Sequence, residues 1–122
     1  MLQQQTRREK HMKWLRHSLT RTSPILEDRL SRAKKTAHQV ARLLKENYDV
    51  NRVRLFGSLL HPDQFHADSD VDLAVEGLTM ANYWDALADV LFFDSEFIID
   101  LVDPETCPSA IWDIVEREGV DL

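Results

Sequence analysis

The chain has 122 residues and a mass of 14.2 kDa, a length that predicts one domain with a single core. Its formal net charge is −6, and 43% of its residues are hydrophobic. No apolar run is long enough to span a bilayer, and no signal-peptide stretch follows the first basic residues. Cys107 is the sole cysteine, which excludes an internal disulfide and a cysteine metal cage. We therefore expect a cytoplasmic protein that does not associate with membranes.

The first part of the chain differs in charge from the rest. Residues 1–23 carry six basic residues and one acid, whereas residues 48–122 carry three basic residues and 17 acids. Residues 1–22 are predicted to be a basic, partly helical leader, because Met12, Leu15 and Leu19 recur at helical spacing. The leader is interpreted either as a solvated extension or as an arm that docks on a partner through Trp14. The acidic remainder favours a metal-dependent site, and we expect no direct nucleic-acid binding.

Residues 23–122 alternate between helical and strand patterns. Ser23–Pro24 is a favourable helix start, and Thr79 is a candidate N-cap for a later helix. Helices are predicted over residues 24–47, 79–93 and 109–119, and strands over residues 52–56, 70–76 and 96–103. We expect two later helices to bury Tyr83, Leu87, Val90, Leu91, Ile111, Ile114 and Val115. A polar loop is expected over residues 63–68. The order predicts an α+β fold in which helices flank a small mixed β-sheet.

Asp70 and Asp72 form an Asp-x-Asp pair on the second predicted strand. Residues two apart on a strand face the same side, roughly 6.5–7 Å apart. Two carboxylates there can bind hard cations such as Mg²⁺, which prefer oxygen ligands. Two metal ions about 3.5–4 Å apart can hold the attacking and leaving oxygens of a phosphoryl transfer. For an isolated Asp-x-Asp, the simpler interpretation is a solvated strand face.

Asp100 interrupts an apolar run, because residues 98–102 read Ile-Ile-Asp-Leu-Val. A single acid in so apolar a strand costs free energy unless it is paired or bound to a metal. If Asp100 shares a site with Asp70 and Asp72, a divalent cation would relieve the repulsion between their charges. Asp100 is therefore the candidate third carboxylate of the site.

Gly57 and Ser58 directly follow the first predicted strand. Glycine allows a sharp turn and a close approach of the backbone to a ligand. Ser58, at the start of a helical turn, offers a hydroxyl and backbone N–H groups to phosphate oxygens. A Gly-Ser pair alone is an ordinary turn, so the indication lies in its combination with the three aspartates.

The ordered segments LFGS (55–58), SDVDLAV (69–75) and IDLV (99–102) resemble the polymerase-β-type nucleotidyltransferase superfamily. The short length is similar to that of its minimal nucleotidyltransferases, the MNT or MntA-like group. Members of that group are antitoxins paired with HEPN-domain ribonuclease toxins. The resemblance implies that this chain transfers AMP from ATP to a tyrosine of such a toxin. It also implies that two Mg²⁺ ions are the cofactors.

The same resemblance assigns roles to individual residues. Asp70, Asp72 and Asp100 would be the catalytic carboxylates and metal ligands, and Gly57 and Ser58 would contact the triphosphate. The chain departs from many relatives at residues 59–62, where Leu-Leu-His-Pro replaces an Ala-Arg-Gly-like segment. His61 or His66 is a candidate substitute for the phosphate-binding arginine that is missing there.

Two further hypotheses remain open on the sequence. The chain is either an antitoxin that acts by direct binding without chemistry, as the departure at residues 59–62 suggests, or a nucleotidyltransferase that modifies a small molecule or a nucleic-acid end. The second hypothesis is less favoured, because we expect no separate domain for binding such an acceptor in a chain of this length. The sequence does not indicate the nucleotide preference, the acceptor residue, the number of AMP units or the stoichiometry of the complex.

Overall fold

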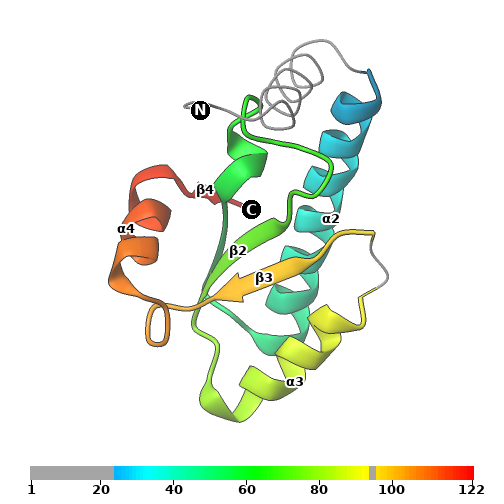
Figure 1. The fold of residues 1–122 in the computed structure, drawn as a ribbon. Helices are drawn as coiled ribbons and strands as arrows, with labels where there is room; N and C mark the ends of the chain where they lie inside the picture. The colour runs from blue at the N-terminus through cyan, green and yellow to red at the C-terminus, as the bar shows by residue number, and fades with distance from the viewer. Residues whose placement is uncertain (1–23, 94–95) are drawn as a thin grey trace, which may run out of the picture.

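A computed structural model describes residues 24–93 and 96–122, and in this part of the chain three α-helices flank one four-stranded mixed sheet (Figure 1). In chain order, the elements are α2 (Pro24–Tyr48), β1 (Arg52–Phe56), the 3₁₀ helix η1 (Gly57–Leu60), β2 (Val71–Glu76), α3 (Met80–Leu91), β3 (Ile99–Val102), α4 (Ser109–Glu118) and β4 (Val120–Asp121). The predicted α+β class is confirmed. The predicted leader over residues 1–22 and the Ser23 cap lie outside the described residues.

The strands follow the order β3-β2-β1-β4. β1 pairs antiparallel with β2 and β4, whereas β2 and β3 are parallel. The parallel pair results from the crossover through α3, since a chain that returns in the same direction needs a connecting element of this length. β4 pairs with Arg54 and Leu55 and was not predicted, because a two-residue strand has too few residues to show an alternating pattern.

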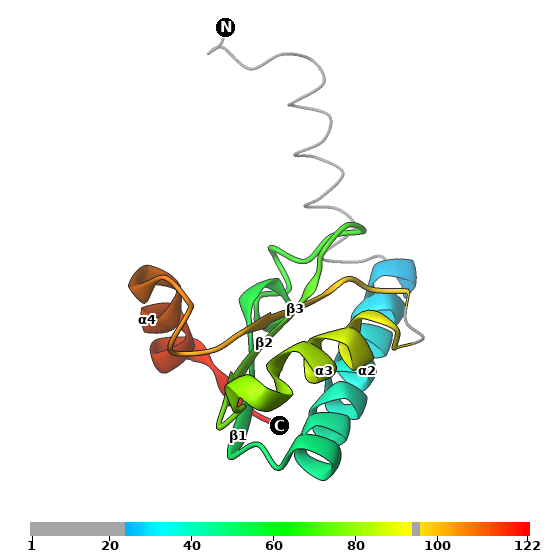
Figure 2. The same ribbon diagram turned by 90° about the horizontal axis from the view of Figure 1, so that it is seen from below.

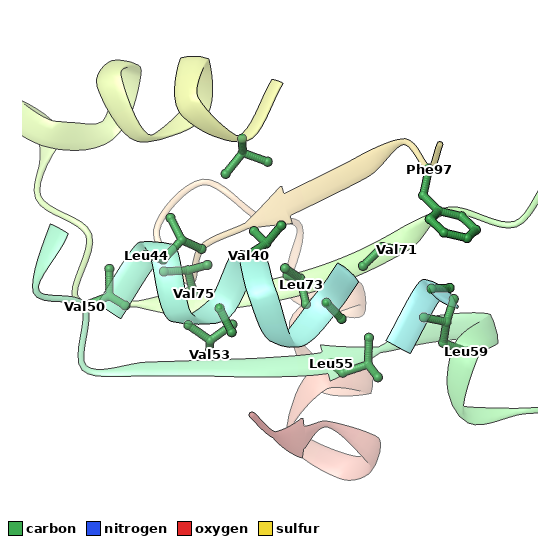
Figure 3. Packing of buried hydrophobic residues seen from close by; sticks show 14 of the residues in the cluster. Val40, Leu44, Val50, Val53, Leu55, Leu59, Val71, Leu73, Val75 and Phe97 are labelled. Atoms are coloured by element: carbon green, nitrogen blue, oxygen red, sulfur yellow. The ribbon is translucent and has the colours of Figure 1, made fainter. Parts of the chain in front are cut away.

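α2 and α3 cover one face of the sheet, and α4 covers the other (Figures 1 and 2). The larger hydrophobic core lies under α2, whose stripe of Val40, Leu44 and small alanines packs on the inward residues of β1 and β2 (Figure 3). Leu73 and Val53 are fully buried there. The helix predicted over residues 24–47 is confirmed, and its buried residues recur every three or four positions, as in an amphipathic helix.

α3 begins at the predicted cap, where the Thr79 side chain accepts a hydrogen bond from the Asn82 backbone N–H. Val90 is buried as expected, but Leu91 is 76% exposed, and Ala86 is buried. The expectation for Leu91 was wrong because α3 has apolar residues on two sides, and the sequence pattern does not tell which side meets the sheet. The loop over residues 63–68 also differs from its polar prediction, because Phe65 is 1% exposed.

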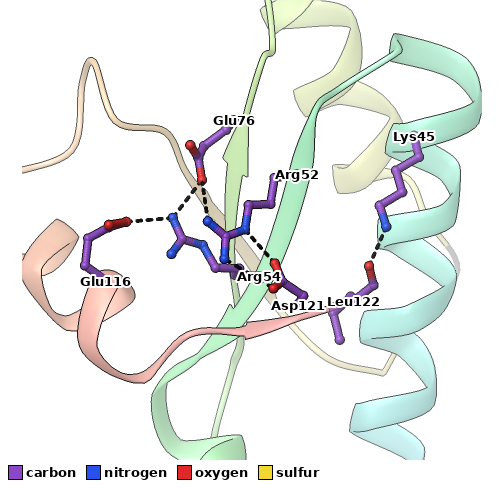
Figure 4. A network of polar contacts seen from close by, with 7 residues as sticks. All are labelled: Lys45, Arg52, Arg54, Glu76, Glu116, Asp121 and Leu122. Atoms are coloured by element: carbon purple, nitrogen blue, oxygen red, sulfur yellow. Dashed lines mark hydrogen bonds and ion pairs between the residues drawn. The ribbon is translucent and has the colours of Figure 1, made fainter.

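The second face of the sheet has a smaller apolar cluster, formed mainly by Phe56, Ala74 and Val115. Beside it lies Arg54, whose side chain is 4% exposed. Its guanidinium donates to Glu76 at 2.7 Å and to Glu116 at 2.9 Å, which ties α4 to the sheet (Figure 4). The same guanidinium lies 5.5 Å from the centroid of the Trp112 ring. A charged network therefore stabilises the packing of α4.

Within the described residues, no helix combines the length and the apolar character needed to cross a membrane.

Candidate active site

The parallel pairing of β2 and β3 brings two of the predicted acids together. Asp72 lies opposite Asp100 in the strand register, and neighbouring strands lie about 4.8 Å apart. Both residues belong to the sheet face that α4 covers, because Asp72 also pairs with Phe56 of β1. Two carboxylates that are 28 positions apart in sequence thus share one side of the sheet.

Gly57 follows β1 directly and lies against the same carboxylate. Its φ of +85° is in the left-handed region, where residues with a side chain are strained. A Cβ added at Gly57 would collide with the Asp72 carboxylate oxygen. Glycine is therefore required here for two reasons, the turn and the close approach to Asp72.

These three residues open into a cavity of about 360 Å³. One side is polar, with Asp72 and Asp100, and the other is apolar, with side chains of β3 and α4. The full lining comprises Phe56, Gly57, Asp72, Asp100, Leu101, Val102, Ile111 and Ile114. A cavity with an apolar wall and a few convergent polar groups is typical of a small-molecule site.

The electrostatics of the cavity centre on Asp72. Burial, together with the negative charges of Asp100 and Asp70, raises the pKa of its carboxyl from the ordinary 3.8 to about 6. A carboxyl whose charge is destabilised by burial and by two neighbouring acids favours the approach of a cation. Asp70 therefore affects Asp72 through its negative charge, which disfavours the ionised form of the Asp72 carboxyl.

Asp100 is more exposed than its apolar neighbours in the sequence suggested. The sequence suggested a buried acid, but Asp100 is exposed and Ile98 is 67% exposed. β3 is the terminal strand of the sheet, so its apolar residues are not covered on both sides as those of a central strand would be. Asp100 thus has no burial cost to relieve. Its candidacy depends on its position opposite Asp72.

Asp70 and Ser58 stand apart from the cavity lining. Asp70 precedes the first residue of β2, and Ser58 lies in η1, where its carbonyl accepts from the His61 backbone N–H at 3.0 Å. In the described chain, no three acidic, histidine or cysteine side chains are gathered closely enough to hold a metal ion. The donors nevertheless fit Mg²⁺ in chemistry, because Asp72 and Asp100 supply carboxylate oxygens and Asp72 is destabilised as an anion.

The two histidines considered as substitutes for arginine are engaged elsewhere. His61 Nε2 lies 2.8 Å from Glu118 Oε1, and His66 Nδ1 accepts from the Asp68 backbone N–H at 3.2 Å. Neither histidine lines the cavity. Asp103, in contrast, accepts from the Glu105 and Thr106 backbone N–H groups and so stabilises the turn after β3.

Two solved structures are similar to this chain, and each alignment covers 70% of this chain and 70% of the other. One is the crystal structure of a toxin–antitoxin with AMP-PNP, with 26% sequence identity and a TM-score of 0.53. The other is the toxin–antitoxin MntA–HpeT carrying a double aspartate-to-glutamate mutation, with 25% identity and a TM-score of 0.51. No protein-family model matches the sequence, and no curated protein matches it significantly.

The chain has the nucleotidyltransferase fold of the MNT antitoxins. Within this MNT fold, sequence reasoning missed the contribution of α4, whose Ile111 and Ile114 form the apolar wall of the cavity. Both had been assigned to the core, yet Ile111 is 37% exposed. The spacing of Ile111 and Ile114, three residues apart, places both on one side of α4. Val115, and not either isoleucine, is the fully buried residue of this helix.

Proposed function

We propose that this chain is the antitoxin of a HEPN/MNT-type pair and a Mg²⁺-dependent protein adenylyltransferase. It transfers AMP from ATP to a tyrosine of its HEPN ribonuclease toxin in the cytoplasm and so inactivates the toxin. The observation that carries the proposal is the position of Asp72 opposite Asp100 on parallel strands, in one cavity that Gly57 enters. Acidic pairs of this kind support phosphoryl chemistry because they can hold divalent cations next to a nucleotide.

The similar structures support the same proposal. One of them contains AMP-PNP, an analogue of ATP, so a related fold is associated with an adenine nucleotide. In the other, the two replaced aspartates are two positions apart, which is the spacing of Asp70 and Asp72 in this chain. Both are toxin–antitoxin structures, which favours a protein partner over a small-molecule acceptor.

In this mechanism Gly57 and Ser58 bind the triphosphate. The left-handed turn at Gly57 lets the backbone approach the phosphates, and Ser58 contributes its hydroxyl and its N–H. Asp72 and Asp100 would hold Mg²⁺, and Asp70 would join them as a further ligand. The metal ion, when bound, neutralises the charge of the phosphate oxygens.

The transfer itself is a substitution at the α-phosphorus. The tyrosine oxygen of the toxin forms a bond to that phosphorus, and the bond from phosphorus to the bridging oxygen of the β-phosphate breaks. Pyrophosphate leaves with the electron pair, and the phenolic proton passes to the carboxylate of Asp100. Asp100 suits this role because it is exposed on the terminal strand, where a protein acceptor can reach it.

The proposal is tested by incubating the chain and its cognate HEPN toxin with ATP labelled at the α-phosphate and Mg²⁺. We expect label on the toxin and a toxin mass increased by one or more AMP units, mapped by peptide sequencing to tyrosine. Asp72→Asn should abolish the label, and Asp113→Asn, an exposed acid of α4 outside the cavity, is the matched control. Undiminished labelling by Asp72→Asn would refute the mechanism.

One observation favours a second candidate, an antitoxin that neutralises its toxin by binding alone. The residues that line the cavity include no lysine, arginine or histidine, although a triphosphate carries several negative charges. In that case the Asp72→Asn variant would neutralise the toxin at the same dose as the wild-type chain. Loss of neutralisation together with loss of labelling would exclude this alternative.

A further inference from the structure

The cavity under α4 has a charged end and an apolar wall. Gly57, Asp72 and Asp100 form the charged end, where the phosphates and a metal ion belong in the proposed mechanism. Ile111 and Ile114 of α4 belong to the wall. The cavity volume of about 360 Å³ is near the lower end of the range for small-molecule sites, about 300–1,000 Å³. A nucleotide whose phosphates occupy the charged end must therefore place its base along the wall.

The wall is part of the packed structure. Ile114 and Val102 are partly buried against the small apolar cluster of this face of the sheet. The hydrogen bond from Arg54 to Glu116, at 2.9 Å, holds the same helix on the sheet. Ile111 is 37% exposed, so part of its side chain is free to contact a ligand. The wall is thus an apolar surface that the fold holds in place.

The wall offers a base apolar contact and no hydrogen bond from a side chain. Among the described residues that line the cavity, the polar side chains are those of Asp72 and Asp100 alone, and both belong to the charged end. The first backbone N–H groups on this side of α4 are also occupied, because those of Ile111 and Trp112 donate to the Pro108 carbonyl at 3.0 and 3.1 Å. The α4 side of the cavity therefore has no free donor in the described chain that could read the edge of a base.

The way in which a base is held determines how well it is selected. A site that hydrogen-bonds a group of its substrate rejects an analogue without that group by about 10⁴–10⁵-fold, whereas an apolar pocket discriminates by size and gives only about 10–200-fold. Adenine and guanine have the same purine ring system and differ in the hydrogen-bonding groups at its edge. An apolar wall therefore makes the same contact with either of them.

We propose that Ile111 and Ile114 hold the base of the substrate nucleotide by apolar contact alone, so that the chain uses GTP about as efficiently as ATP. The inference rests on the proposed function, because it assumes that the phosphates lie at the Gly57 end. With GTP the reaction is the same substitution at the α-phosphorus, in which GMP is transferred and pyrophosphate leaves. Pyrimidine nucleotides bind less tightly, since a smaller ring buries less apolar area.

The first test measures binding of AMP-PNP and of GMP-PNP, each with Mg²⁺, to the full chain by calorimetry. The two dissociation constants should agree within about tenfold, as expected for an apolar site. Ile111→Ala should raise both by about three- to tenfold, because it removes an apolar contact, and should leave their ratio unchanged. Ile25→Ala is the matched control and should change neither, because Ile25 is 81% exposed but lies on α2, on the other face of the sheet.

Two results of the binding test would overturn the inference. A preference of about 10³-fold or more for AMP-PNP exceeds what apolar contact supplies and would require a group that reads the base edge. Unchanged dissociation constants for Ile111→Ala would show that the base does not lie on the wall. Alanine is the most favourable helix residue, so this substitution leaves α4 intact.

Label transfer separates this inference from the proposed function. With the cognate HEPN toxin, α-labelled ATP and α-labelled GTP should both label the toxin, with kcat/KM values within about tenfold of each other. If both analogues bind as predicted but neither nucleotide labels the toxin, the transferase proposal fails and the base site stands. If ATP labels the toxin and GMP-PNP does not bind, the base inference is overturned while the transferase stands. If neither analogue binds, both are overturned.

Discussion

The two faces of the sheet differ in what they contain. Under α2 and α3, the contacts are apolar, and side chains such as Leu44, Leu73 and Val40 are fully buried. Under α4, the apolar cluster is small, and it is bordered by the buried Arg54 and by the cavity with Asp72 and Asp100. The same sheet thus presents an uncharged core on one side and charged groups on the other.

The two faces show how a small domain accommodates a destabilising site. Burial of apolar area is the dominant favourable term in folding, and here the face under α2 supplies most of it. The other face can then hold neighbouring carboxylates, although their repulsion opposes folding. Stability and chemistry should therefore respond to substitutions on different faces, and each prediction below tests that separation.

Asp100→Asn should decrease the rate of AMP transfer by about 10²–10⁴-fold, as for the loss of a positioned acid–base group. Because Asp100 is exposed, the free energy of unfolding should change by about 0.5 kcal/mol or less. Single-turnover transfer assays and urea denaturation measure the two quantities. A large loss of stability with this substitution would break the separation between the faces.

Leu44→Ala should produce the converse result. Leu44 is fully buried under the sheet, and removing such a side chain costs about 2–5 kcal/mol of unfolding free energy. Leu91→Ala, on an exposed leucine of α3, is the control and should cost about 0.5 kcal/mol or less. Activity per folded molecule should be unchanged in both variants when a non-protein acceptor is used. Equal destabilisation by the two substitutions would contradict the assignment of the core.

Arg54→Met tests the charged clamp on α4. The substitution keeps an apolar stem but removes the partner of Glu116 and leaves Glu76 only its longer ion pair with Arg52, at 3.9 Å. We expect a loss of about 1–3 kcal/mol in unfolding free energy and weaker binding of nucleotide, since α4 carries the cavity wall. Arg42→Met removes an exposed ion pair within α2 and should change stability by about 0.5 kcal/mol or less. If Arg54→Met retains full stability, the clamp has no structural role.

Asp72→Asn should stabilise the metal-free protein while it removes activity. The folded pKa of about 6 exceeds the ordinary 3.8, so the folded state binds more protons between these values and wild-type stability falls as pH rises from about 4 to 6. The asparagine side chain does not titrate, so the stability of the variant does not fall over this pH range. Its advantage should grow over that range and reach about 1 kcal/mol above pH 7, a discounted figure because the carboxyl is partly solvated. Thermal unfolding in a chelator measures it, and an advantage that shrinks with pH would show that burial and the neighbouring acids do not destabilise the Asp72 carboxylate.

The sequence predicted the elements that have strong periodic patterns. The α2 stripe and the alternation in β2 each contain enough residues to define a buried side. Gly57, Asp72 and Asp100 were predicted to belong to one site, and the structure places all three at one cavity. The roles assigned to them stay predictions.

Other features depend on tertiary contacts that the sequence pattern does not contain. The exposure of Asp100 results from the terminal position of β3, and the burial of Arg54 results from α4 packing over it. The cavity wall formed by Ile111 and Ile114 depends on where α4 lies relative to β3. The exposed position of Leu91 depends on the rotation of α3 about its own axis.

If the face under α4 binds an adenine nucleotide, an NMR titration of the ¹⁵N-labelled chain with AMP-PNP and Mg²⁺ will detect it. We predict saturable shifts of the backbone amides of Gly57, Ser58, Asp72, Asp100 and Ile114, with those of Val40 and Leu44 on α2 unchanged. Asp72→Asn should lose the shifts that depend on Mg²⁺. Shifts confined to α2 and α3, or no shifts at millimolar nucleotide, would contradict the account.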